Sequence, residues 1–90
     1  MMDQTIRALS DPTRREILRA LRAGDLTAGE IGARFPITAA SISHHLNVLR
    51  EAGLVSVERQ GRNQVYSLES TVFEEFLNEM MTLFGRGDER

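Results

Sequence analysis

The chain has 90 residues, of which 41% are hydrophobic and 27% charged, so it can form one folded domain and is too ordinary in composition for a disordered or fibrous protein. It contains no Cys, which excludes disulfides, thiolate metal sites and a cysteine nucleophile. The net charge is −2, but it is unevenly spread. Nine Arg against seven acidic residues make positions 1–67 positive, whereas two Arg against six acidic residues make positions 68–90 negative.

Two helices are predicted at the start of the chain. Residues 3–9 place two apolar side chains at helical spacing, which predicts a short first helix. Asp11 offers a capping carboxylate and Pro12 suits a first helical position, so a second helix begins there and ends at Gly24. Its apolar face consists of Ile17, Leu18 and Leu21. The arginines expected largely on its other faces are Arg14, Arg15, Arg19 and Arg22.

A helix-turn-helix is predicted in the middle of the chain. Thr27 and Glu30 form a capping box that opens a third helix, and we expect this helix to run to about Phe35 because a proline follows. A connection of about three residues then leads to a fourth helix over residues 39–52, which Thr38 caps and a glycine closes. Two helices joined by so short a turn are typical of a helix-turn-helix.

A β-hairpin is predicted next. Residues 54–59 and 64–68 alternate in polarity and are rich in branched side chains, which favours two strands. The turn at 60–63 carries Gly61 and Asn63 where positive φ angles are expected.

The chain is expected to end in one more helix. Ser70 or Thr71 caps this helix, which runs through Phe84, and residues 85–90 look like a frayed tail. The order α-α-α-α-β-β-α predicts a mainly helical winged helix-turn-helix as a single domain over residues 1–90.

The exposed face of the fourth helix is the candidate nucleic-acid interface. Ile42, Leu46 and Leu49 must face the core, and the opposite face is small, polar and uncharged over its first two turns. Such a face suits the major groove better than it suits solvent alone, and the arginines at the hairpin tip suit phosphate or the minor groove. The candidate DNA-binding residues are Thr38, Ala40, Ser41, Ser43, His44, His45, Asn47, Arg59 and Arg62.

The two histidines do not predict a metal site. His44 and His45 are adjacent, so their side chains point about 100° apart, whereas a helical two-histidine site needs a spacing of three or four residues. His45 lies at the edge of the core face, where it is either a structural histidine or a phosphate contact.

The last helix carries more apolar surface than one small domain can cover. It is either a central core element or, as we favour, part of a symmetric dimer interface together with the first helix. The candidate interface residues are Ile6, Leu9, Val72, Phe73, Phe76, Leu77, Met80 and Phe84.

The sequence predicts a DNA-binding protein and no enzyme. It has no Gly-rich phosphate loop, no Ser-x-x-Lys, no His-Glu-x-x-His and no acid pair in an apolar setting, and we expect no cofactor. It has no apolar run that could span a bilayer and no signal-peptide pattern, so we expect a cytoplasmic protein that is not inserted in a membrane. The alternative function is a winged helix that serves only as a protein-interaction module.

Two runs resemble the ArsR-type winged-helix repressors. Residues 8–18 read ALSDPTRREIL, like the opening signature of that family, and residues 41–55 read SISHHLNVLREAGLV, like its recognition helix and first wing strand. The wing at 62–68 fits as well, so the resemblance covers roughly residues 5–84. It implies a homodimer, formed through the first and last helices, that binds an imperfect inverted repeat in a promoter.

The departures from that family also carry information. Its metal-sensing members have Cys in the third helix or His and acidic ligands on the last helix, and its redox-sensing members need Cys. This chain has no Cys and no His beyond position 45, and is most similar to the sensorless, SdpR-type autorepressor branch. The resemblance implies regulation by a protein partner or by autoregulation, without metal.

Overall fold

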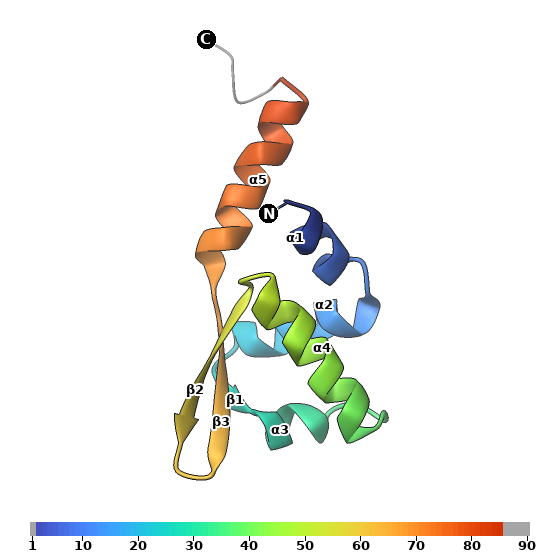
Figure 1. Ribbon diagram of the computed structural model, residues 1–90, viewed down its shortest axis with the longest axis vertical. Coiled ribbons are helices and arrows are strands. Elements are labelled where there is room, and N and C mark those ends of the chain that lie inside the picture. The colour runs from blue at the N-terminus through green and yellow to red at the C-terminus, as the bar shows by residue number, and fades with distance from the viewer. Residues whose placement is uncertain (1, 86–90) are drawn as a thin grey trace.

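The computed structural model describes residues 2–85, which form five helices and a small sheet (Figure 1). The elements are α1 (Met2–Leu9), α2 (Pro12–Arg22), β1 (Leu26–Thr27), α3 (Ala28–Gly32), α4 (Ala39–Glu51), β2 (Val55–Gln60), β3 (Asn63–Leu68) and α5 (Ser70–Leu83). This order confirms the mainly helical winged helix-turn-helix. The predicted tail at 85–90 falls, beyond Gly85, outside the described residues.

The starts of α2 and α3 are fixed by the capping residues that the sequence indicates. The Asp11 carboxylate accepts a hydrogen bond from the Arg14 backbone N–H at 3.1 Å, and α2 begins with Pro12. At the start of α3, the Thr27 hydroxyl accepts from the Glu30 N–H at 3.0 Å and the Glu30 carboxylate accepts from the Thr27 N–H at 2.8 Å. The predicted caps of α2 and α3 are therefore confirmed.

The helix α3 is shorter than predicted and ends at Gly32 instead of about Phe35. After it the Arg34 N–H donates to the Ile31 carbonyl and the Phe35 N–H to the Gly32 carbonyl, so the chain tightens into turns with i to i−3 hydrogen bonds. The proline that follows disfavours a continued α-helix. The connection to α4 therefore spans residues 33–38 and not about three residues.

The sheet has three strands in the order β1-β3-β2, one more than predicted. The hairpin β2–β3 pairs Val57 with Tyr66, and Tyr66 also pairs with Leu26 of β1 on the other side. The two residues of β1 are too few to show an alternating pattern in the sequence. In the hairpin turn only Gly61 has a positive φ, of 63°, and Asn63 is the first residue of β3, so the expectation for Asn63 was wrong.

The core lies between α2, α3, α4 and the inner face of the sheet. It includes Ile17 and Leu21 of α2, Ile31 of α3 and Leu49 of α4. One charged side chain joins it, because Arg14 is only 8% exposed. Helical spacing predicts that Arg14 lies largely away from the apolar face, and this prediction was wrong because backbone carbonyls of α1 accept hydrogen bonds from its guanidinium.

The last helix, α5, extends away from the body and lies beside α1 (Figure 1). Ser70 is its first helical residue and the cap position is Glu69, whose side chain makes no capping hydrogen bond, so the predicted cap at Ser70 or Thr71 was wrong. No residue of α5 is buried. The alternative of a central core helix therefore does not hold within this chain. Between residues 2 and 85, no helix has the length and hydropathy that crossing a membrane requires.

Candidate nucleic-acid interface

The helix α4 presents the polar face that its sequence predicts. Ile42, Leu46 and Leu49 are buried, and Val48 joins them. On the other side the exposed residues are Ala40, Ser43, His44 and Asn47. The exposed side of the first two turns carries no charged residue, so small hydrogen-bonding groups are all that it offers to a partner.

The start of α4 is held by Thr38. Its hydroxyl oxygen accepts from the Ser41 N–H at 3.1 Å, and the hydroxyl donates to the Ser41 side-chain oxygen at 3.2 Å. Both residues were predicted to bind DNA, and both also fix where α4 begins. The remaining free N–H groups of the first turn point along the helix axis, as at any helix start.

Part of the polar face borders a hollow of about 540 Å³ between α3, α4 and β3. Ser43 and Asn47 line it from α4, facing Gln64 and Tyr66 of the sheet. The Arg50 guanidinium donates to the Asn47 side-chain oxygen at 3.3 Å. This contact uses the Asn47 side-chain oxygen as an acceptor, and the NH₂ group remains as a donor.

The wing arginines lie at the hairpin tip. Arg59 and Arg62 are exposed, and Arg59 Nε donates to the Gly61 carbonyl at 3.4 Å. Both line a shallow hollow of about 250 Å³ with Thr27 and Gly29 at the start of α3. In Figure 1 the hairpin tip, α3 and the first turn of α4 lie at one end of the molecule, and α5 lies at the other.

His45 differs from the other candidates because its ring turns inward. The side chain is 15% exposed, and Nδ1 lies 3.1 Å from a guanidinium nitrogen of Arg14 and 3.9 Å from the Asp11 carboxylate. His44 stays exposed, with its ring centroid 5.8 Å from that of His45. For Nδ1, the interpretation of His45 as a structural histidine therefore holds, because this atom contacts Arg14 inside the protein.

The charges around His45 affect its protonation. Burial lowers the pKa of His45, and although the Asp11 carboxylate raises it, the positive charges of Arg14 and His44 lower it, so that it lies below the ordinary histidine value. For Asp11, burial raises the pKa, but the backbone hydrogen bond from Arg14 and the charges of His45 and Arg14 outweigh it, and the pKa is lowered. Both shifts favour an ionised Asp11 beside a neutral His45.

Comparison with known proteins places this geometry in a family. The helix-turn-helix domain family matches residues 9–58. The transcriptional repressor SdpR of Bacillus subtilis is 46% identical over 87 residues, which are 97% of each chain. An ArsR-like transcriptional regulator from Rhodococcus sp. RHA1 superimposes with a TM-score of 0.80 at 31% identity, over 93% of this chain and 78% of that one. This chain belongs to the ArsR family of helix-turn-helix transcriptional regulators.

A second solved structure agrees with this assignment. A possible transcriptional regulator for arsenical resistance has a TM-score of 0.80 at 33% identity, over 91% of this chain and 84% of the other. The resemblance drawn from the two sequence runs is thus confirmed, and so is the winged fold. As an ArsR-family member, the protein is a DNA-binding transcriptional regulator and not an enzyme.

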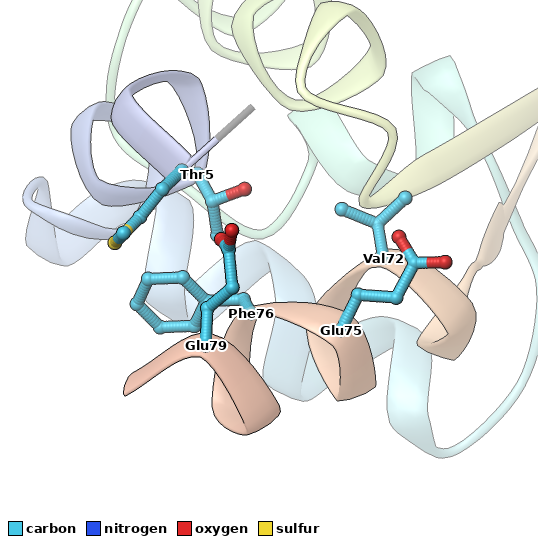
Figure 2. A pocket seen from close by; sticks show the side chains of 6 residues that line it. Thr5, Val72, Glu75, Phe76 and Glu79 are labelled. Carbon is cyan, nitrogen blue, oxygen red and sulfur yellow. The ribbon is translucent and has the colours of Figure 1, made fainter. Parts of the chain in front are cut away.

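The candidate dimer residues of this ArsR-family chain fall into two groups. Leu9 and Val72 pack partly against the protein's own core. Ile6, Phe73, Leu77 and Phe84 are exposed, and Phe76 and Met80 are half-buried. Figure 2 shows Phe76 and Glu79 reaching from α5 toward Thr5 of α1. These side chains line a hollow whose volume is about 390 Å³.

The described part of the chain, residues 2–85, contains no group of three or more His, Asp and Glu side chains that could hold a metal ion. His44 and His45 sit on adjacent faces of α4, and the carboxylate nearest to His45 already caps α2.

Sequence reasoning missed Arg14 as a functional candidate. Its signal was present in the run Asp11-Pro12-Thr13-Arg14, in which a capping residue is followed by an arginine whose side chain can turn back toward the preceding helix. A helical wheel assigns an arginine to solvent, and it contains no information on acceptors outside the helix.

Proposed function

We propose that this chain is a homodimeric, sequence-specific repressor that binds an imperfect inverted repeat in a promoter, without sensing metals or thiols. The observation that carries this proposal is the uncharged polar face of α4 at the same end of the molecule as the arginines of the wing. Its similarity to the repressor SdpR supports repression as the outcome of binding.

The exposed face of α4 is proposed to read bases, whereas the start of α4, His45 and the wing are proposed to contact the DNA backbone or the minor groove. Small and polar side chains let a helix approach base edges, and Ser, His and Asn can donate to or accept from them. The base-reading residues are Ala40, Ser43, His44 and Asn47. The residues proposed to contact phosphate or the minor groove are Thr38, Ser41, His45, Arg59 and Arg62.

The dimer is proposed to form through α1 and α5. The apolar residues of α5 that the protomer leaves exposed suit a second copy, and α1 lies beside them. A symmetric dimer would present two α4 helices to two half-sites, which matches an inverted repeat. With no sensor residues in the sequence, relief of repression is assigned to a protein partner or to autoregulation.

The test is selection of bound sites from a random DNA pool, followed by salt titration of binding to the selected site and to random duplex. A sequence-specific repressor should select a repeat with two-fold symmetry and lose affinity log-linearly with salt on both duplexes. A selected site placed in a promoter should lower transcription in vitro. Selection of no sequence, with little binding to random duplex, would favour the rival role as a protein-interaction module.

A further inference from the structure

Arg14 is the only charged side chain that is buried within residues 2–85. Its Nε donates to the Ala8 carbonyl and a terminal nitrogen donates to the Arg7 carbonyl, each at 2.9 Å. Its other terminal nitrogen lies 3.1 Å from Nδ1 of His45. One guanidinium thus connects the last turn of α1 and the first turn of α2 with the middle of α4.

This geometry decides which ring nitrogen of His45 carries the proton. A guanidinium has only donors, so Nδ1 must accept and the proton of the neutral ring lies on Nε2. The Asp11 carboxylate is 3.9 Å from Nδ1, beyond hydrogen-bond distance, and therefore does not set the tautomer.

The Nε2–H group of His45 is available to a partner. Nε2 makes no hydrogen bond to any residue from 2 to 85, and within that range no buried polar side-chain atom lacks a partner. Nε2 must therefore reach solvent, although the ring as a whole is only 15% exposed. The group is a single donor held in place at the edge of the polar face of α4.

We propose that Arg14 is a positioning residue for DNA binding: it holds His45 in the Nε2–H tautomer, and Nε2–H donates to a phosphate oxygen of the DNA backbone. The inference rests on the proposed placement of α4 against DNA. A phosphate oxygen accepts and never donates, so the opposite tautomer would present a lone pair to it. His45 is absent from the hollow that Ser43 and Asn47 line, which favours the backbone beside the groove over a base edge.

The first experiment needs neither DNA nor a variant. Nitrogen-15 NMR of the imidazole rings in the free protein, at slightly alkaline pH, should show His45 almost entirely as the Nε2–H tautomer. Arg14→Lys keeps the positive charge but cannot make the three simultaneous hydrogen bonds of the guanidinium. In this variant the His45 signal should move toward a mixture of tautomers. An Nδ1–H tautomer or an even mixture in the wild-type protein would overturn the proposal, even if Arg14→Lys fails to fold.

The second experiment separates the two nitrogens of His45. His45→Asn retains a polar atom near Nδ1 and lacks the outer donor, whereas His45→Gln places an amide near Nε2. His45→Asn should weaken binding to selected and random duplex alike, by about tenfold per subunit, as expected for one hydrogen bond to a charged group. The salt slope should not change, because a neutral donor displaces no counterion. His45→Gln should recover most of the affinity.

Asn47→Ala distinguishes failure of this inference from failure of the proposed function. If Asn47→Ala lowers the ratio of selected-site to random binding while His45→Asn leaves both affinities unchanged, α4 reads DNA and the role of His45 is wrong. A loss confined to the selected site in His45→Asn would make His45 a base reader and also overturn the inference. If neither variant changes binding, the placement of α4 itself is wrong.

Discussion

Gly53 and Val72 meet where α4 has ended and α5 begins. A Cβ atom added to Gly53 would lie 2.9 Å from a methyl carbon of Val72, which is closer than two non-bonded carbon atoms normally come. Gly53 also has a φ of 79°, which side chains other than glycine rarely adopt. Gly53 thus changes the direction of the chain after α4. Because it has no side chain, it also lets Val72, in the first turn of α5, pack against it.

This contact predicts that Gly53→Ala destabilises the fold by about 2–4 kcal/mol. Two effects contribute, because alanine is strained in a left-handed backbone conformation and its methyl group would be overpacked against Val72. Gly61→Ala is the matched control, because Gly61 has a φ of 63° but open space around it, and should cost only about 1 kcal/mol. Urea unfolding measures both. Val72→Ala should recover part of the loss in Gly53→Ala, and equal losses in the two glycine variants would contradict the close approach.

The lowered pKa of His45 predicts that stability falls as the pH is lowered below about 6.5. In this range the unfolded chain binds a proton at position 45 that the folded chain does not, so unfolding takes up protons and acid favours it. The loss should continue down to the pKa in the folded state. Urea unfolding between about pH 5 and pH 7 should show a smaller pH dependence in His45→Asn than in the wild type. An unchanged dependence would contradict the shift.

The starts of α2, α3 and α4 could be predicted because capping is local chemistry. Asp11, Thr27 and Thr38 each bond to a backbone group three residues ahead, so their roles can be recognised from spacing alone. The polar face of α4 was also predictable, because helical periodicity separates it from the core. The chemistry of a site that one helix presents is thus largely readable from its sequence.

The features that the sequence does not predict depend on distant partners. The strand β1 exists because Leu26 pairs with Tyr66, forty positions later in the chain. The burial of Arg14 is completed by His45, 31 positions away. Neither contact leaves a periodic pattern, since each involves a single pair of residues brought together by the fold.

The exposed apolar residues of α5 predict that charge at Leu77 prevents dimer formation. Leu77 is 44% exposed in the protomer, so Leu77→Glu should leave the protomer folded and place an unpaired charge in the interface. In Leu77→Glu, the dissociation constant of the dimer should rise by roughly a hundredfold. Phe76→Glu should weaken the dimer as well and should also lose operator affinity. Sedimentation measures the assembly, with the adjacent exposed Asn78→Glu as the control. A wild-type monomer at micromolar concentration would refute the dimer.

Metals are predicted not to regulate this ArsR-family member. The sequence has no Cys, and residues 2–85 contain no cluster of three His, Asp and Glu donors that could hold a metal. Zinc, cadmium or arsenite at micromolar concentration should neither bind stoichiometrically nor release the protein from DNA. Calorimetry and a DNA-binding assay test this prediction, and tight binding of one ion per subunit would contradict it.

The division of work between α4 and the wing gives the last prediction. His44 and Asn47 are exposed on α4 and are proposed to read bases, so His44→Ala and Asn47→Ala should each weaken operator binding by about 1–3 kcal/mol and leave random binding nearly intact. Glu51→Ala, in the last turn of the same helix, is the control.

Arg62→Ala should have the opposite signature. Arg62 is exposed at the hairpin tip, where a guanidinium meets phosphate or the minor groove. Its loss should weaken operator and random binding alike and lower the salt slope by about one unit per subunit, because one fewer counterion is displaced. Binding to operator and scrambled duplex at several salt concentrations gives both quantities. If Arg62→Ala changes the operator-to-random ratio while the two α4 variants do not, the wing reads the sequence and α4 only anchors.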